Sequence, residues 1–398
     1  MIAISTTWNY HRHGAIAPAV REISDLGFTA VEIRAKGAVP DHQDGGRAIR
    51  EGRIRCRSIH APLTTGPWID GDPTRDFAST DELQRTRAVR AVLTAVPAAA
   101  ASGADIIVVH AGEVAMDRAA ERQEGWLADI VKGKDVTSEV TAALADRKKL
   151  RDAHLEAAAR SLFDLTRAAP DVTFAIEGRL HFHEIPNLEE VELLLLDAGG
   201  RRVAYWHDTG HAHLIGKLGV TEPLAWLDSH GGRTVGIHLH DVVGDLDHLP
   251  PGGGEVDWPG IAQAAGSAMV KVMEIHRRHA PGELLRGADH LASVGLCGGS
   301  LHPPLLLVSS CSDHGDWESP MHKRQQPYVV DENAGTRAVC ACGNSERLPY
   351  CDGSHFGSKY QPFMVQIDEP KRVAWCGCRR SGNPPYCDGT HAKASGSG

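Results

Sequence analysis

Short apolar runs rich in β-branched residues recur along the first three quarters of the chain, and amphipathic stretches lie between them. Runs of this kind are typical of buried strands. Eight are found, at residues 2–6, 30–34, 55–61, 105–110, 172–177, 203–208, 234–239 and 270–275. The amphipathic stretches predict helices from Pro18 to Gly27 and over residues 81–101, 147–168 and 188–197. The last is followed by Gly199 and Gly200, and glycine is the usual residue after a helix end.

Eight strands that alternate with helices predict an α/β fold, a (β/α)8 barrel, over residues 1–296. The alternative is a doubly wound open sheet. No glycine-rich dinucleotide turn follows any of the strands, which favours the closed barrel. A long polar segment at 113–146 separates the fourth strand from its helix. We interpret it as a lid or a subdomain.

The pattern changes after the eighth strand. Residues 297–326 show neither a helical nor a strand period, and we interpret them as a linker. The remainder, 327–398, is a second and smaller domain that we expect to be rich in β-structure. A length of 398 residues accommodates a barrel of roughly 250 residues plus such a unit.

The nine cysteines are unevenly placed, and six of them lie between 340 and 387 in two similar groups of three. The first group reads Cys340-Ala-Cys342, then Cys351-Asp-Gly-Ser-His355, and the second reads Cys376-Gly-Cys378, then Cys387-Asp-Gly-Thr-His391. Each copy offers three thiolates and one imidazole, which suit either tetrahedral zinc or an iron–sulfur cluster. Zinc ribbons more often use two residues between paired cysteines, so the single-residue spacing favours a cluster.

Both copies resemble the CDGSH iron–sulfur family at every signature position. The resemblance implies one 2Fe–2S cluster per motif, each bound by three cysteines and one histidine. It assigns Cys340, Cys342, Cys351 and His355 to one cluster, and Cys376, Cys378, Cys387 and His391 to the other. It also implies electron transfer, or transfer of a cluster or iron to an acceptor protein. A histidine ligand is protonatable, so we expect the bound cluster to be labile to acid.

Histidines and carboxylates stand at the ends of six consecutive predicted strands, the third to the eighth. They are His60, His110, Glu177, Asp208, His238 and Glu274, and His211 follows Asp208 by three residues. The active sites of such barrels lie at the carboxyl ends of their strands. Mixed imidazole and carboxylate ligands suit Mn, Zn, Co or Fe better than Ca. The pattern therefore predicts a divalent metal site in the barrel.

The first domain resembles the xylose-isomerase-like barrel superfamily, which contains sugar isomerases and epimerases and the endonuclease IV group. The motifs that carry the resemblance are Ser58-Ile-His60-Ala-Pro62, Val109-His110-Ala-Gly112, Asp208-Thr-Gly-His211, Ile237-His238-Leu-His240-Asp241 and Met273-Glu274. The isomerase branch implies one metal on Glu177, Asp208, His238 and Glu274. Glu177 and Glu274 then exchange a proton with a ketose or keto-acid, and His211 orients a substrate oxygen.

The endonuclease branch implies a zinc phosphodiesterase with His60, His110 and His211 as further ligands. Its third zinc needs Asp-x-His after the seventh strand, but Leu246 stands two residues before His248, where that aspartate should be. The net charge of −9 is carried by residues 1–296, which disfavours a nucleic acid as partner. We therefore favour a small-molecule substrate. A third interpretation is a non-catalytic barrel that serves as partner of the redox module.

Composition and the first residues bear mainly on where the protein is located in the cell. No apolar run approaches the roughly 18 residues of a membrane-spanning helix. The first residues, Met1-Ile-Ala-Ile-Ser5, lack a basic segment and a cleavage pattern. The sequence thus predicts a cytoplasmic protein without a membrane partner, and it leaves the oligomeric state open.

Overall fold

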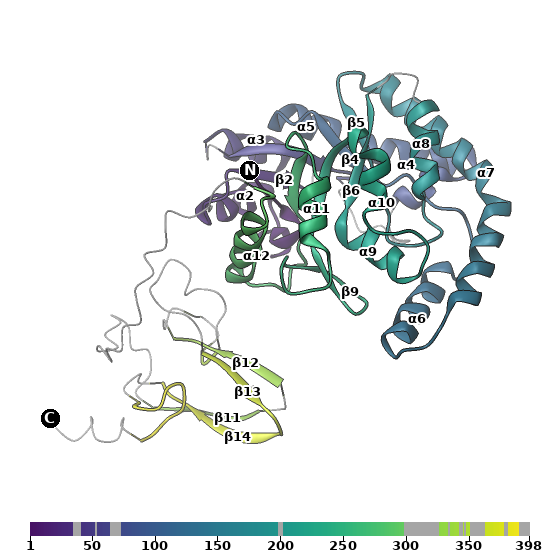
Figure 1. The fold of residues 1–398 in the computed structure, drawn as a ribbon. Helices are drawn as coiled ribbons and strands as arrows, with labels where there is room; N and C mark the ends of the chain where they lie inside the picture. Colours follow the sequence, from purple (N-terminus) through teal and green to yellow (C-terminus); the bar gives the residue numbers. More distant parts are fainter. Residues whose placement is uncertain are drawn as a thin grey trace. The chain divides into compact units, whose positions relative to one another are not determined.

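The computed structural model describes two compact units, Met1–Leu305 and Leu306–Gly398 (Figure 1). The described residues are 1–34, 41–51, 54–63, 73–197, 202–297, 326–332, 335–341, 345, 348–350, 363–377 and 381–389. The predicted linker, 297–326, lies outside them except for its two end residues. No helix of the described part of the chain is long and apolar enough to cross a membrane.

Eight parallel strands of the first unit close into a barrel, as predicted. They are β1 (Ala3–Ser5), β2 (Ala30–Ile33), β3 (Arg55–His60), β4 (Ile106–Val109), β5 (Thr173–Glu177), β6 (Val203–Asp208), β7 (Thr234–Leu239) and β10 (Val270–Met273). Neighbours in the barrel follow chain order, and β1 pairs with both β2 and β10. This closing pair of ladders excludes the open sheet.

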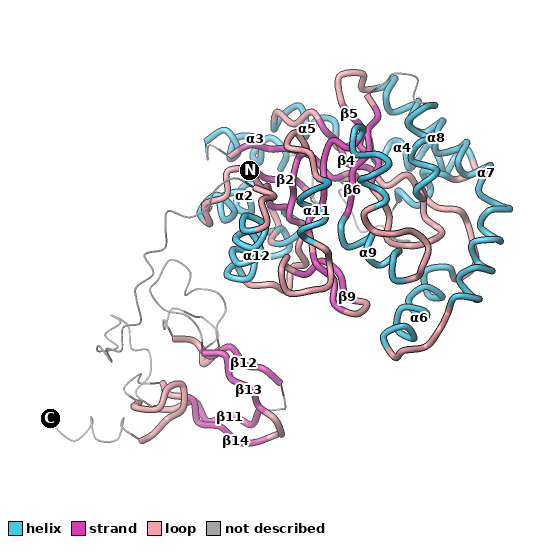
Figure 2. Tube along the Cα trace, in the orientation of Figure 1, coloured by secondary structure: helices cyan, strands magenta, loops and turns pink. Residues whose placement is uncertain are grey.

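Helices lie around the strands (Figure 2). They are α1 (Tyr10–His13), α2 (Ile16–Asp25), α3 (Asp41–Glu51), α4 (Glu82–Leu93), α5 (Val96–Ser102), α6 (Ala119–Val131), α7 (Thr137–Ala168), α8 (Leu188–Asp197), α9 (Thr209–Lys217), α10 (Ala225–His230), α11 (Trp258–Ala264) and α12 (Pro281–Ser293), with short 3-10 turns at Thr6–Trp8, Pro73–Ala78 and Gly231–Arg233. The single helix predicted over 81–101 was wrong. It is two helices, α4 and α5, because Pro97 in the first turn of α5 has no N–H to continue a helix that precedes it.

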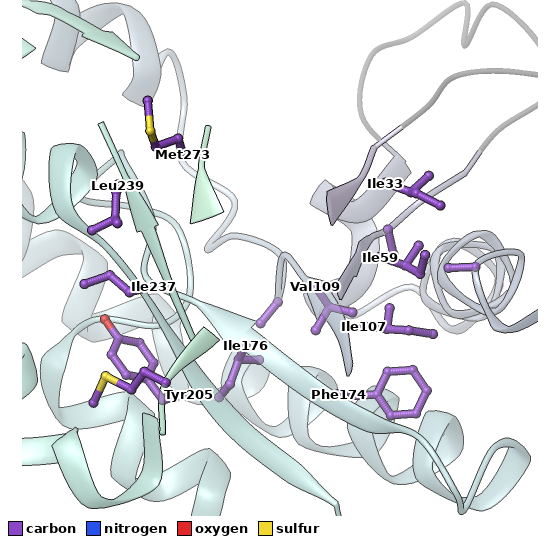
Figure 3. Close-up of a cluster of buried hydrophobic side chains, with 14 of the residues drawn as sticks. Ile33, Ile59, Ile107, Val109, Phe174, Ile176, Tyr205, Ile237, Leu239 and Met273 are labelled. Atoms are coloured by element: carbon purple, nitrogen blue, oxygen red, sulfur yellow. The ribbon is translucent and has the colours of Figure 1, made fainter. Parts of the chain in front are cut away.

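Strand residues alternate between two apolar layers, and this alternation positions the chemistry. Ile107 and Val109 of β4 belong to the large cluster between strands and helices, whereas Ile106 and Val108 belong to a small one that also holds Trp206. Figure 3 shows part of the large cluster. Side chains two residues apart share a face of a strand. A side chain two residues after a member of the small cluster therefore points the same way, into the barrel interior, at the carboxyl end of its strand.

The polar segment 113–146 is largely helical. It forms α6 and the first third of α7, which therefore begins ten residues before the predicted helix. Gln123 of α6 ties it to the segment after β5, since it donates to the Leu180 carbonyl at 2.8 Å and accepts from the Phe182 N–H at 2.7 Å. The segment is therefore a helical subdomain that is anchored beside the carboxyl end of β5.

A small hairpin follows β7 and is held by one carboxylate. Its strands are β8 (Asp241–Val243) and β9 (Leu246–Leu249). Asp241 accepts from the N–H groups of Gly252 and Gly254 at 2.8 and 3.0 Å, and from Trp258 Nε1 at 3.0 Å. A Cβ on Gly254 would clash with Asp241 Oδ1, so only glycine allows this approach. The glycine-rich segment at 252–254 is thus a turn that Asp241 holds in place beside the hairpin.

The second unit is built from strands exchanged between the two cysteine repeats, and it is rich in β-structure as predicted. Its strands are β11 (Tyr328–Glu332), β12 (Gly335–Val339), β13 (Phe363–Ile367) and β14 (Lys371–Trp375). The antiparallel pairs are β11 with β14 and β12 with β13. Each pair takes one strand from each repeat. Val339, Ile367, Val373 and Trp375 form the shared core, so neither repeat completes a sheet or a core from its own described residues.

Candidate metal centre and cluster motifs

The structure brings the six predicted barrel residues together at the carboxyl ends of the strands. All six are buried: His60, His110, Glu177, Asp208, His238 and Glu274. Ligand atoms of His60, Glu177, His238 and Glu274 lie within 4.8 Å of one another, and so do those of Glu177, Asp208 and His211. Four of them end or lie in a barrel strand, and His110 and Glu274 directly follow β4 and β10.

His238 lies at the centre of this group. Its Nδ1 is 3.0 Å from Glu177 Oε1, 3.1 Å from Glu274 Oε2 and 3.5 Å from Asp208 Oδ2. Three carboxylates therefore converge on one imidazole nitrogen. These are the four residues predicted to hold a single metal.

The second carboxylate oxygen of Glu177 faces two other histidines. His110 Nε2 lies 2.9 Å and His60 Nε2 3.3 Å from Glu177 Oε2. The rings of His60 and His110 meet edge to face at 4.9 Å. Glu177 therefore joins two half-sites, one with Asp208, His238 and Glu274 and one with His60 and His110.

The electrostatics of the cluster favour a cation. Burial opposes ionisation of Glu177, but the imidazoles of His110, His238 and His60 that face it outweigh burial and hold its pKa well below the usual value. The pKa of Glu274 is also held well below its usual value against burial, by His238 and Arg34. Burial would lower the pKa of His238, yet the carboxylates around it raise this pKa well above its ordinary value.

The donor set fits a divalent metal. Buried atoms without a hydrogen bond of normal geometry include His60 Nε2, Asp208 Oδ2 and Glu274 Oε2, all in this cluster. Buried polar atoms are normally hydrogen-bonded, and a bound ion is one reason for an exception. Imidazole nitrogens with carboxylate oxygens suit Mn, Zn, Co or Fe.

Two arginines and a further glutamate also lie at the site, and the sequence analysis assigned a role in the site to none of them. Arg34, just after β2, forms an ion pair with Glu274. Arg179, just after β5, lies 3.2 Å from Glu177 Oε2 and 2.9 Å from Glu184. Glu32 is wholly buried in the middle of β2 and contacts His238. Glu32 could have been noticed in the sequence, because it is a charged residue inside the otherwise apolar run Ala-Val-Glu-Ile.

His211, predicted to orient substrate, lies at the edge of the cluster. Asp208 is the N-cap of α9 and accepts from the His211 backbone N–H at 2.8 Å. The His211 ring places Nδ1 3.0 Å from the Gly178 carbonyl, which can only accept, so Nδ1 carries the hydrogen. This fixes the ring and leaves Nε2 as the acceptor.

The position predicted to hold an aspartate for a third zinc is occupied differently. Leu246 is 53% exposed, and the next residue, Asp247, lies 3.1 Å from His248 Nδ1. His248 stacks on His240 with ring centroids 4.1 Å apart. His211, His240 and His248 can each bring a nitrogen within 4.8 Å of the others. Leu246 therefore contributes no ligand, and three imidazoles lie close together beside the hairpin.

In the second unit, the repeat in sequence is also a repeat in structure. The N–H of Cys340 donates to the Pro349 carbonyl, and that of Cys376 to the Pro385 carbonyl, both at 2.8 Å. The Ser345 and Ser381 hydroxyls each donate at 2.6 Å to the carbonyl of the tyrosine five residues later. Of the eight predicted ligands, the structure describes Cys340, Cys376 and Cys387. The others lie outside the described residues: Cys342, Cys351, His355, Cys378 and His391.

One buried carboxylate connects the two repeats. Glu332 accepts from Tyr350 Oη at 2.8 Å, Trp375 Nε1 at 2.9 Å and Arg337 Nε at 2.6 Å. Tyr350 directly precedes Cys351 of the first motif, and Trp375 directly precedes Cys376 of the second. Glu332 thus joins the ligand-bearing segments of both motifs.

We expect Glu332→Ala to destabilise the second unit by about 1–3 kcal/mol, because it leaves the buried Trp375 Nε1 hydrogen without its acceptor. Hydrogen exchange of the β11 and β14 amides in the full chain measures this locally. Glu369→Ala, at an exposed position of the same unit, is the matched control and should leave exchange unchanged. Equal exchange in both variants would contradict the role of Glu332.

Comparisons with known proteins agree with both resemblances. A family model described as a xylose isomerase-like TIM barrel matches residues 20–294. A model described as an iron-binding zinc finger of CDGSH type matches residues 314–356 and 359–392, once per repeat. The uncharacterized protein y4fM of Sinorhizobium fredii (strain NBRC 101917 / NGR234) is 26% identical over 285 residues, which are 65% of this chain and 81% of the relative.

Two solved structures are similar to the two parts of the chain. A D-tagatose 3-epimerase-like protein is 15% identical, with a TM-score of 0.51 over 74% of this chain and 96% of that one. At this identity the likeness shows the fold alone. The human mitochondrial inner NEET protein (MiNT)/CISD3 is 32% identical, covering 19% of this chain and 87% of that one, with a TM-score of 0.17.

Proposed function

This chain belongs to the xylose isomerase-like TIM barrel family, and a tandem CDGSH domain follows its barrel. From this family membership, we propose that the barrel is a metal-dependent isomerase or epimerase. Its substrate is a ketose or keto-acid. The observation that carries the proposal is the convergence of Glu177, Asp208 and Glu274 on one nitrogen of His238.

The two glutamates have the properties of proton carriers. Each has an arginine partner, Arg179 for Glu177 and Arg34 for Glu274, and each has a lowered pKa. Both are therefore ionised near neutral pH, so either can accept a proton from the carbon beside the substrate carbonyl. A carboxyl that holds this proton returns it to carbon, and the reaction is redox-neutral.

The remaining residues bind and orient. Glu177, Asp208, His238 and Glu274 would hold the ion, one of Mn, Zn, Co or Fe. Bound there, a divalent ion supplies Lewis-acid polarisation of a carbonyl oxygen. His211, with Nδ1 held by Gly178, presents Nε2 as an acceptor for a substrate hydroxyl. Burial of the whole group strengthens these interactions by excluding water.

For the second unit, the proposed cofactors are two 2Fe–2S clusters, one per motif, with electron transfer or transfer of a cluster or iron as their role. The described Cys340 and Cys376 have the same backbone hydrogen bond, which supports two equivalent sites. The partner is an acceptor protein. The chain is proposed to work in the cytoplasm, without a membrane partner.

A second candidate activity is phosphodiester hydrolysis. One observation favours it. His60 and His110 lie close to Glu177 Oε2, and these three side chains could bind a second ion. Two ions joined by one carboxylate are typical of phosphoryl-group hydrolases. The acidic first domain, which carries the chain's net charge of −9, opposes a nucleic-acid substrate.

The test uses the full chain loaded with Mn²⁺ or Zn²⁺ and a panel of ketoses and keto-acids in D₂O. The proposal predicts metal-dependent deuterium uptake at the carbon beside the carbonyl, measured by NMR. In parallel, a DNA duplex with one abasic site is offered to the same protein. Nicking without deuterium uptake would favour the hydrolase. If the barrel binds metal but shows neither reaction, it is a binding domain without either catalytic activity.

A further inference from the structure

The two ring nitrogens of His238 have different surroundings. Nδ1 faces the three carboxylates of Glu177, Glu274 and Asp208. Nε2, on the opposite side of the ring, lies 3.2 Å from both carboxylate oxygens of Glu32. The predicted metal position is thus on one side of the ring, and a carboxylate with no assigned role is on the other.

Glu32 is built into the barrel wall rather than into the metal cluster. It lies on β2 and is 0% exposed, as is His238. The Ser58 hydroxyl of the neighbouring β3 donates to Glu32 Oε2 at 2.8 Å, which holds the carboxylate in place. Glu32 belongs to none of the groups of side chains that could share a metal among the described residues.

The His238 ring is packed on two sides. His60 stacks on it with centroids 5.6 Å apart and an interplanar angle of 2°. The Trp206 ring packs against it at 5.1 Å with an angle of 65°. With an ion held by the three carboxylates, Nδ1 would face that ion, and the group that faces Nε2 then decides where the ring hydrogen lies.

We propose that Glu32 is a positioning residue that holds the hydrogen of His238 on Nε2 and so presents the Nδ1 lone pair to the metal. This inference rests on the metal site of the proposed function and assigns the residue that orients one of its ligands. Glu32 Oε2 already accepts from the Ser58 hydroxyl, and as an acceptor it takes the hydrogen of the ring nitrogen that faces it. A neutral imidazole that donates through one nitrogen has its lone pair on the other.

Such a partner also makes the imidazole a stronger ligand. A carboxylate that accepts from the far N–H of a ligating histidine raises the basicity of the near nitrogen, and its loss typically weakens metal binding about 10- to 100-fold. In Glu32→Gln the side chain keeps its size but loses its charge, and its amide group can donate to Nε2. That contact would favour the hydrogen on Nδ1, where it blocks the metal.

The experiment titrates Co²⁺ into the full chain and follows its visible spectrum, with iron of the second unit measured separately. We expect Glu32→Gln to weaken Co²⁺ binding about 10- to 100-fold with an unchanged unfolding temperature. Ser58→Ala removes only the hydroxyl that orients Glu32, so its effect should be smaller. Glu22→Gln, a carboxylate beside α1 that contacts Arg12 and His13, is the matched control and should bind Co²⁺ like the unmodified chain.

A second measurement uses the unmodified chain, so it does not depend on whether a variant folds. In the Zn²⁺-loaded unmodified chain, ¹⁵N NMR of His238 should show a protonated Nε2 and a metal-bound Nδ1. A metal-bound Nε2, or Co²⁺ affinity unchanged in Glu32→Gln, would overturn the role of Glu32 and leave the metal site intact. Failure of the unmodified chain to bind Co²⁺ or Zn²⁺ in the barrel would instead overturn the proposed function.

Discussion

Glu177→Gln is expected to abolish the isomerase activity and to weaken metal binding in the barrel. Glu177 is the residue on which both half-sites depend, because one oxygen faces His238 and the other faces His60 and His110. Glutamine has the same shape but no charge, and its amide nitrogen would face a histidine or Arg179. Loss of a proton carrier alone lowers a rate by about 10²- to 10⁴-fold.

The measurement for Glu177→Gln is the rate of deuterium uptake by the substrate, together with metal bound per chain. Glu255→Gln is its control, since Glu255 is a half-exposed carboxylate that pairs with Lys217 at 2.7 Å. That variant should retain the full rate. If Glu177→Gln turned over substrate as fast as the unmodified chain, the assignment of the proton carrier would be wrong.

Cys387→Ser is expected to remove one of two clusters and to halve the iron content, from about four to about two atoms per chain for two 2Fe–2S clusters. Cys387 is the described third cysteine of the second motif, and its N–H donates to the Ala374 carbonyl of β14 at 2.8 Å. A serine hydroxyl is a poor replacement for a thiolate as an iron ligand. The visible absorbance per chain should fall in the same proportion.

Cys56→Ala is the control for this prediction. Burial raises the pKa of the Cys56 thiol to about 12, so it is protonated at neutral pH and cannot serve as a thiolate ligand. Its removal should leave iron and sulfide unchanged, and acid should bleach the remaining absorbance in every variant. A colourless protein with stoichiometric zinc would show that the motifs hold single ions.

The architecture of the first unit could be predicted because its signals are local. Each buried strand has a contiguous apolar run, and the residues that end the runs, such as Glu177 and Asp208, need only the strand period to be placed inside the barrel. The break between α4 and α5 also has a local signal, Pro97, which the amphipathic pattern over residues 81–101 masks. Helix ends and insertions are harder to predict because they depend on contacts such as that of Gln123 with the segment after β5.

What could not be predicted depends on pairing between distant residues. Nothing local shows that β11 pairs with β14, or that Glu332 reaches Trp375 across 43 positions. Arg34 and Arg179 lie just past strand ends, where charged residues are common, so only the structure shows that they pair with Glu274 and Glu177. Glu32 left a local signal, but its partner His238 is 206 positions away. The roles of the cluster ligands stay predictions, since five of them lie outside the described residues.

Anomalous scattering from crystals of the full chain tests the central claim most directly. Data on both sides of the iron and zinc or manganese edges locate each metal and identify it. We predict a divalent ion bound by His238 Nδ1 and the carboxylates of Glu177, Asp208 and Glu274, and two pairs of iron atoms in the second unit. A metal-loaded crystal with no anomalous peak beside His238 Nδ1 would contradict this metal site.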